Sequence, residues 1–277
     1  MNFKRIYQKI YYQFLKRHYY GITAKSRVLP DFLIIGAVRS GTTSLYYDIC
    51  QHPSVKKAAY DEIGFFDDNY HLGLNWYRSM FPTEKKMSKI QKETGFCVTG
   101  EDTPFYIWNK NVIEKIKNLI PEIKLIVILR NPVDRAYSNY HLSVREGNEN
   151  RSFKDAIRED IKFINYKKCN NEELTNIDFK KSYIAKGLYY DQLLNWFNTF
   201  DKKQICIVFT EDLRDNPEDT MQTIFKFLQL PFFSIKKYEK QKMSDYDDME
   251  KEIRMELSRY YESYNEQLFE LIKRRCW

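Results

Sequence analysis

Short apolar runs alternate with amphipathic stretches along most of this chain. The run at 29–36 ends in glycine and predicts a strand, and apolar residues at helical spacing follow it at 42–51. Two later runs, 124–129 (KLIVIL) and 204–209 (QICIVF), are apolar almost throughout, as strands buried on both faces of a parallel sheet are. The chain is therefore predicted to contain buried strands, the first of them followed by a loop and a helix.

Helices are predicted in the intervals between and after these strands. Pro132 and Pro217 stand near the first turns of two of them, where proline is tolerated because its missing N–H would have no partner there. An amphipathic repeat predicts a long closing helix. The predicted helices cover 112–119, 132–146, 183–200, 217–228 and 250–273. Strands that alternate with helices predict an α/β fold, a three-layer α/β/α sandwich with a central parallel sheet.

The organisation expected is one large domain, because no internal repeat and no Pro-, Gly- or Ser-rich linker divides the chain. We predict an N-terminal amphipathic extension over 1–28 and the main domain over 29–277. The extension mixes basic and aromatic residues and lacks the uninterrupted apolar stretch of a signal peptide or spanning helix. We therefore expect no integral membrane segment, while docking on the domain and peripheral membrane contact both fit the amphipathic pattern.

Composition narrows the class of partner. A hydrophobic fraction of 43% is enough for a substantial core. Lys and Arg outnumber Asp and Glu by 45 to 38, which favours anionic ligands mildly, but no nucleic-acid-binding motif accompanies this excess and no such partner is expected. The five cysteines form no C-x-x-C pair, and the four histidines lack metal-ligand spacing. We expect a cytoplasmic location and no bound metal.

A phosphate-binding loop is indicated at 36–43 (GAVRSGTT), between the first predicted strand and its helix. Backbone N–H groups and the positive end of a helix cradle phosphate in this setting. The Walker pattern G-x-x-x-x-G-K-[ST] would need a lysine where Thr42 stands, so an ATP or GTP hydrolase is disfavoured. The cation is instead Arg39, inside the loop.

A second anion site is indicated where the strand at 124–129 ends. Arg130 follows that strand directly, and Ser138 lies on the helix that begins at Pro132. Ligands of open parallel sheets bind at the carboxyl ends of the strands, so both predicted sites face the same edge.

The loop at 36–43 resembles the 5′-phosphosulfate loop of the sulfotransferases that use 3′-phosphoadenosine-5′-phosphosulfate (PAPS), whose pattern is similar to G-x-x-K-x-G-T-T. The segment 130–138 resembles their 3′-phosphate motif, R-x-P-x-x-R-x-x-S. The similarity extends over roughly 30–277 and includes heparan sulfate and other glycan-type members as well as bacterial ones. It implies a P-loop-like sulfotransferase domain with PAPS as co-substrate, adenosine 3′,5′-bisphosphate as product and no metal.

The resemblance also assigns roles to residues. It implies that PAPS is bound by Arg39, Ser40, Gly41, Thr42, Thr43, Ser44, Arg130 and Ser138. Arg39 replaces the usual catalytic lysine; because arginine is a poor proton donor, we expect it to stabilise charge on the leaving phosphate. A basic loop over the nucleotide is matched loosely at 236–242, which makes Lys240 and Lys242 weaker binding candidates. Arg135 is expected to be structural and to pair with a carboxylate.

The acceptor side is less well marked. Glu62 stands in a segment that resembles the E-x-x-F-F stretch carrying the catalytic base of glycan-type members, and it is the candidate base, ahead of Asp61. Heparan-type members usually carry a lysine where Asp102 or Thr103 stands here, which argues against a highly sulfated acceptor. The segment 148–181 is polar and irregular, and we expect acceptor specificity there and around 55–80.

The predicted function is transfer of a sulfuryl group from PAPS to a hydroxyl or amine of a small natural product or a saccharide, with Glu62 and Arg39 as catalytic residues. Two alternatives remain open from the residues. One is a P-loop nucleoside or small-molecule kinase, and the other is a non-catalytic nucleotide-binding module. The oligomeric state and the identity of the acceptor are not predicted.

Overall fold

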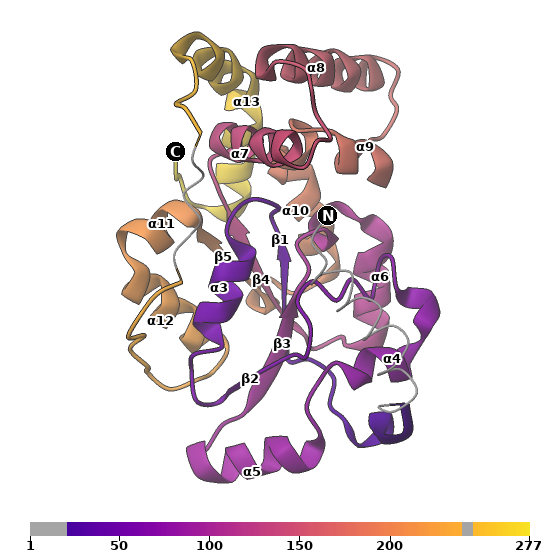
Figure 1. The fold of residues 1–277 in the computed structure, drawn as a ribbon, viewed down its shortest axis with the longest axis vertical. Helices are drawn as coiled ribbons and strands as arrows, with labels where there is room; N and C mark the ends of the chain where they lie inside the picture. Colours follow the sequence, from indigo (N-terminus) through magenta and orange to yellow (C-terminus); the bar gives the residue numbers. More distant parts are fainter. Residues whose placement is uncertain (1–20, 240–245) are drawn as a thin grey trace.

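A five-stranded parallel sheet forms the centre of the computed structural model, which describes residues 21–239 and 246–277. The strand order is β2-β3-β1-β4-β5 (Figure 1). The strands are β1 (Phe32–Gly36), β2 (Val55–Lys57), β3 (Val98–Asp102), β4 (Lys124–Leu129) and β5 (Ile205–Phe209). The prediction of an α/β fold around a parallel sheet is confirmed, and β1, β4 and β5 lie within the three apolar runs.

Both faces of the sheet are covered, which explains why its central strands are apolar throughout. In β4, Ile126 and Ile128 face one layer, while Leu125 and Val127 face the other. The first layer contains α3 (Thr42–Ile49), α11 (Thr210–Asp215) and α12 (Pro217–Phe227), and the second contains α4 (Leu74–Ser79), α6 (Lys110–Leu119) and α10 (Tyr189–Thr199). A further helix, α5 (Glu84–Thr94), precedes β3. The three-layer sandwich is thereby confirmed.

A group of helices lies beyond the carboxyl ends of the strands, at the top of Figure 1. It contains α7 (Pro132–Arg145), α8 (Phe153–Cys169), α9 (Asn176–Lys181) and α13 (Lys251–Ile272). The hydrophobic cluster of this group includes Ile157 of α8 and Leu257 of α13, both fully buried. These helices lie over the carboxyl ends of the strands, which is where open parallel sheets bind their ligands.

The expectation that 148–181 is irregular is wrong, because α8 and the whole of α9 lie within it. The buried residues of α8 are Phe153, Ala156, Ile157 and Ile164, which follow helical spacing. Ser152 caps the helix by accepting a hydrogen bond from the N–H of Asp155. The apolar stripe is narrow and most of the remaining residues are charged, so the average polarity of the segment hides the helix.

The helix predicted at 183–200 begins later than expected, at Tyr189, after the 3₁₀ turn η5 (Ala185–Gly187). The turn lies very close to two helices. A Cβ added at Gly187 would come within 2.8 Å of the Tyr261 hydroxyl oxygen and 2.9 Å of Pro132 Cβ. This close approach requires glycine at position 187.

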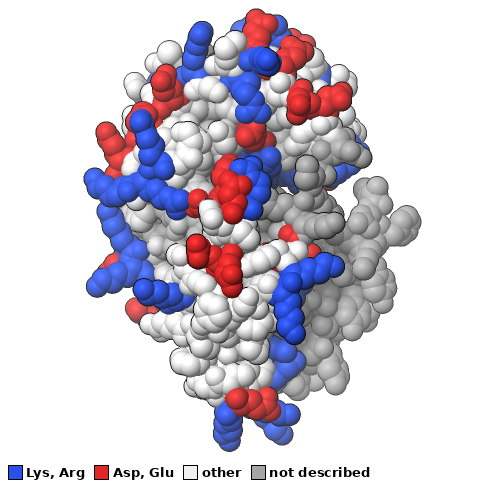
Figure 2. All heavy atoms as spheres, turned by 90° about the vertical axis from the view of Figure 1, so that its left-hand side faces the viewer, with Lys and Arg blue, Asp and Glu red and all other residues white. Residues whose placement is uncertain are grey.

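Charged side chains of both signs are interspersed on the face shown in Figure 2. None of the helices within 21–239 and 246–277 has both the length and the apolar character needed to cross a membrane. All five cysteines are free thiols. The predicted extension at 1–28 falls mostly outside the described residues, and its separation from a domain at 29–277 stays a prediction.

Candidate active site

The loop between β1 and α3 has the backbone geometry of a tight phosphate-binding turn. Arg39 and Gly41 both adopt left-handed conformations, with φ of +68° and +91°. The N–H of Ala37 donates to the carbonyl oxygen of Ile128 in β4 at 2.7 Å, which anchors the loop to the neighbouring strand. The loop then enters the N-terminus of α3 at Thr42, where unpaired N–H groups and the helix dipole attract an anion.

The remaining loop residues differ in exposure. Ser40 and Thr42 are buried, Thr43 is exposed, and Gly41 and Ser44 are half-buried. The Thr210 hydroxyl donates a hydrogen bond to the carbonyl oxygen of Ser40 at 2.7 Å. The loop is therefore fixed on its inner side, while Gly41, Thr43 and Ser44 remain at least partly accessible.

The two predicted anion sites meet at the sheet edge. Arg39 donates from Nε and Nη2 to the Ser138 hydroxyl oxygen, at 3.2 and 3.1 Å. Arg130 donates from Nη1 to the carbonyl oxygen of Arg39 at 3.3 Å. Because β1 and β4 are adjacent in the sheet, the loop after β1 and the helix after β4 begin side by side. The structure thus brings Arg39, Arg130 and Ser138 into one cluster.

This cluster is strongly positive. Burial lowers the pKa of the Arg39 guanidinium, and the positive charges of Arg145, Arg130 and Arg135 lower it further. Arginine remains a cation at neutral pH even so, which leaves like charges facing one another. An anion bound among them would relieve this repulsion, so the residues present fit a phosphorylated ligand.

Glu62 lies at the same edge of the sheet, in the connection that follows β2. Its backbone has φ of +51°, and Phe65 three residues later stacks on Tyr77 with ring centroids 4.2 Å apart, which anchors the connection. The N–H of Gly64 donates to the Thr103 hydroxyl just beyond β3, at 3.1 Å. Since β3 is the neighbour of β1, Glu62 lies over the strand next to the phosphate loop.

Asp61, the less favoured candidate base, is already engaged. The Tyr47 hydroxyl donates to its Oδ2 at 2.6 Å, and Lys57 Nζ lies 3.0 Å from its Oδ1. The Asp61 carboxylate is thus held by a cation and a phenol. Glu62 stays the candidate base because of the segment in which it stands, which resembles E-x-x-F-F.

A family profile described as sulfotransferase domain matches residues 29–270. The chain belongs to the sulfotransferase family.

Individual relatives agree with this membership. The chain is 27% identical to the membrane-associated sulfotransferase kil1 of Dictyostelium discoideum, over 91% of its own length and 67% of that protein. It is 28% identical to the human bifunctional heparan sulfate N-deacetylase/N-sulfotransferase 2, over 89% of its length but only 30% of that protein. A sulfotransferase from Alicyclobacillus acidocaldarius, with 25% identity and a TM-score of 0.67, covers 90% of this chain and is itself covered to 98%.

This sulfotransferase holds its site together with residues that sequence reasoning treated as structural or did not notice. The Thr210 hydroxyl, which contacts the carbonyl oxygen of Ser40, also lies 3.0 Å from the carbonyl oxygen of Leu129. The Tyr189 hydroxyl donates to the carbonyl oxygen of Arg130 at 2.9 Å, and Glu211 accepts from the N–H of Asn131 at 3.0 Å. These contacts come from the start of α11, directly after β5, and from the start of α10, far along the chain from the motifs. Only the position of Thr210 and Glu211 after a predicted strand, and of Tyr189 within a predicted helix, could have indicated them.

Arg135 does not pair with a carboxylate among the described residues, which corrects that expectation. It is fully buried and donates to the carbonyl oxygen of Tyr183. Beside it, Lys186 is buried as well, and burial together with the charge of Arg135 lowers the Lys186 pKa to about 7. Lys186 Nζ donates to Asn139, the residue after Ser138, at 3.1 Å. Both cations therefore hold α7 against the turn η5 and keep Ser138 in place.

Two buried acids, Glu101 and Asp102, are the last residues of β3 and lie close to Glu62. Glu101 accepts hydrogen bonds from the Tyr77 and Thr103 hydroxyls at 2.8 and 2.7 Å, and burial raises its pKa to about 7. Asp102 is fully buried, and burial, with the nearby charges of Asp61 and Glu62, raises its pKa well above the usual range. Asp102 is thus a group that favours its neutral form.

Stability is expected to fall as pH rises through this region because of Glu101. Its folded-state pKa of about 7 lies above the ordinary value of 4.5, so between these values the folded protein holds a proton that the unfolded chain has lost. Above the folded-state pKa, the free energy of unfolding should be lower by the full amount, roughly 3 kcal/mol. Chemical denaturation of the wild type and Glu101→Gln at several pH values between 4 and 9 measures it; parallel pH profiles for the two proteins would contradict it.

Some predicted residues cannot be placed. Lys240 and Lys242 lie outside the described residues, so their assignment to the nucleotide site stays a prediction.

His141, on α7, stacks on Tyr246 with ring centroids 4.1 Å apart, and it contributes to an aromatic wall near the cationic cluster. Within the described ranges, no three His, Cys, Asp or Glu side chains come together as a metal site requires.

Proposed function

We propose that this sulfotransferase transfers the sulfuryl group of PAPS to a hydroxyl or amine of an acceptor and releases adenosine 3′,5′-bisphosphate. Arg39, Ser40, Gly41, Thr42, Thr43 and Ser44 would hold the 5′-phosphate end. Arg130 and Ser138 would hold the 3′-phosphate. The observation that carries the proposal is the contact of Arg39 with Ser138 and of Arg130 with the Arg39 carbonyl, since it joins two anion sites as a bisphosphorylated nucleotide requires.

In this reaction Glu62 accepts the proton as the O–H or N–H bond of the acceptor breaks. The acceptor oxygen or nitrogen bonds to sulfur, while the bond from sulfur to the 5′-phosphate oxygen breaks and its electron pair leaves with the bisphosphate. Arg39 stabilises that charge electrostatically, because an arginine side chain supplies fixed N–H donors but does not give up its proton readily. The transfer is thus balanced without a further reactant.

For the acceptor we propose a saccharide or a small natural product. Relatives named as heparan sulfate N-sulfotransferases support the saccharide class. The presence of Asp102 or Thr103 in place of the lysine that the resemblance implies favours an acceptor with less negative charge than heparan sulfate. A cytoplasmic location remains a proposal as well, and one relative is described as membrane-associated.

A nucleotide panel tests the donor. We expect adenosine 3′,5′-bisphosphate to raise the melting temperature much more than ADP, which lacks the 3′-phosphate. A panel of saccharides and small hydroxyl or amine compounds incubated with PAPS should then yield a product heavier by one SO₃ group in mass spectrometry. A response to ATP with none to the bisphosphate would favour the kinase alternative, and bisphosphate binding without turnover on any acceptor would favour the non-catalytic module.

Removing the 3′-phosphate contacts should abolish this discrimination. Ser138→Ala and Arg130→Gln are each expected to weaken binding of adenosine 3′,5′-bisphosphate by about 10- to 100-fold, the value of a hydrogen bond to a charged group, and to change ADP binding much less. Isothermal titration of both nucleotides measures the ratio. Arg158→Gln is the matched control, since that arginine forms an exposed pair with Glu256. Equal losses for both nucleotides would contradict the assignment.

A further inference from the structure

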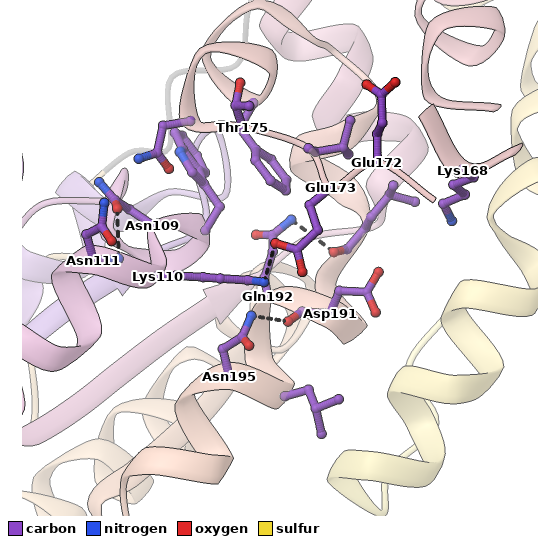
Figure 3. Close-up of a pocket in the computed structure, with 16 residues that line it drawn as sticks. Asn109, Lys110, Asn111, Lys168, Glu172, Glu173, Thr175, Asp191, Gln192 and Asn195 are labelled. Atoms are coloured by element: carbon purple, nitrogen blue, oxygen red, sulfur yellow. Dashed lines mark hydrogen bonds and ion pairs between the residues drawn. The ribbon is translucent and has the colours of Figure 1, made fainter. Parts of the chain in front are cut away.

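A separate cavity of about 590 Å³ lies between helices that do not carry the predicted catalytic residues. Figure 3 shows the side chains that line it, which come from the start of α6, from α8 and the connection to α9, and from α10. No residue of the phosphate loop and none of 130–138 lines it. Its volume falls in the range of small-molecule binding sites, so the cavity is large enough to hold a ligand.

The side-chain amide of Gln192 has one oxygen that can accept a hydrogen bond from a ligand. Its side chain is 2% exposed and lines the cavity. Nε2 donates to the carbonyl oxygens of Ala185 and Leu188, at 3.1 and 3.0 Å. Two carbonyl acceptors on one end of the amide fix that end as the nitrogen. The other end, Oε1, accepts no hydrogen bond from the described residues, and a donor of a bound molecule would satisfy this buried acceptor.

The rest of the wall combines neutral amides with aromatic rings. Asn109, Asn111 and Asn195 line the cavity together with Gln192. Asn195 Nδ2 already donates to the carbonyl oxygen of Asp191 at 2.8 Å, so Asn195, like Gln192, has its amide oxygen left as the acceptor for a ligand. Trp108 and Phe179 also line it, with rings stacked 5.8 Å apart at 9°. Alternating donors and acceptors beside apolar ring surface suit a pyranose, which presents hydroxyl groups around its edge and C–H groups on its faces.

The lysines of the rim are already partnered, and Asp191 adds a negative charge to the lining. Lys110 pairs with Glu173 at 2.7 Å, and the Lys168 Nζ donates to the Tyr264 hydroxyl at 2.6 Å. Glu172 pairs with Lys167 at 2.8 Å. Since each lysine of the rim has an acceptor in place, the cavity offers little attraction to a polyanion, and its hydrogen-bonding capacity is mainly that of the uncharged amides.

We propose that this cavity binds a neutral saccharide unit, with Gln192 Oε1 accepting from a sugar hydroxyl and Asn195 adding a second polar contact. The site is distinct from the predicted transfer site, so it does not depend on the proposed reaction. In an enzyme that sulfates a glycan it would hold a part of the chain that does not react.

The test uses the full chain without PAPS and two neutral probes, cellotetraose and tetra-N-acetylchitotetraose, with a heparin tetrasaccharide as the charged comparison. At least one neutral probe should show saturable binding by ligand-observed NMR below about 10 mM. Asn195→Leu should weaken that binding by about tenfold or more, because it removes an amide and narrows the cavity. Asn198→Leu is the matched control, as that exposed asparagine is on the same helix but does not line the cavity.

Gln192→Leu provides a second variant, and its melting temperature is measured alongside, since the substitution also removes two bonds to backbone carbonyls. A folded Gln192→Leu protein should bind the neutral probe at least as poorly as Asn195→Leu does. The proposal is overturned if neither neutral probe binds, if Asn195→Leu and Asn198→Leu bind alike, or if the heparin tetrasaccharide binds more tightly at the Asn195-sensitive site. Binding of adenosine 3′,5′-bisphosphate, measured on the same Asn195→Leu sample, should be unchanged, which separates this result from a failure of the proposed transferase function.

Discussion

Replacing Arg39 by alanine is expected to lower the rate of sulfuryl transfer by about 10²- to 10³-fold, the cost of removing one group that stabilises transition-state charge. Arg39 lies inside the phosphate loop and reaches Ser138 with two nitrogens, so no neighbouring side chain of the loop can replace it. Burial of the site strengthens its electrostatic effect relative to water. The measurement is the turnover of PAPS with an acceptor identified from the panel, followed by mass spectrometry.

Arg39→Lys is the informative companion variant. Lysine keeps the positive charge and is the residue that the family pattern places there, so this variant should retain much of the activity that alanine loses. Both substitutions meet the same left-handed backbone at position 39, and their comparison therefore isolates the charge. An alanine variant as active as the wild type would show that Arg39 does not act in the transfer step.

Replacing Glu62 by glutamine is expected to reduce kcat by about 10²- to 10⁴-fold, as the loss of a general base does. Glutamine has nearly the same shape and the same preference against the φ of +51° at this position, but it cannot accept the proton. Binding of adenosine 3′,5′-bisphosphate should stay unchanged, because the proposed nucleotide contacts lie in the loop after β1, at the start of α3, at Arg130 and on α7. Steady-state kinetics together with nucleotide titration separates the two effects.

Asp61→Asn serves as the control for this prediction. Its carboxylate is held by Lys57 and Tyr47, and its loss should disturb local packing with a smaller effect on kcat than that of Glu62→Gln. If Asp61→Asn were the more damaging of the two, the base would have been misassigned between neighbouring acids. If Glu62→Gln kept the wild-type rate, another group would accept the proton.

The elements missed by sequence reasoning share a physical cause. β3 ends in Glu101 and Asp102, two acids that are fully buried, so this strand has no apolar run to indicate it. β2 has three residues, two of them lysines. α8 shows charged residues around most of its surface, and its buried stripe is narrow. In each case tertiary contacts, and not local hydrophobicity, decide the structure.

The amino-acid pattern by itself determined the three buried strands and the loops that follow two of them, because a strand covered on both faces must be apolar and its adjacent turn needs specific residues. It also placed a cation in each loop. Only the tertiary structure decided that Arg39, Arg130 and Ser138 touch one another, that Thr210 and Tyr189 hold them, and that Gln192 faces a cavity with one oxygen unsatisfied. These contacts join residues far apart in the chain, and they depend on the order of strands in the sheet and on the packing of helices above it, which no local stretch of residues encodes.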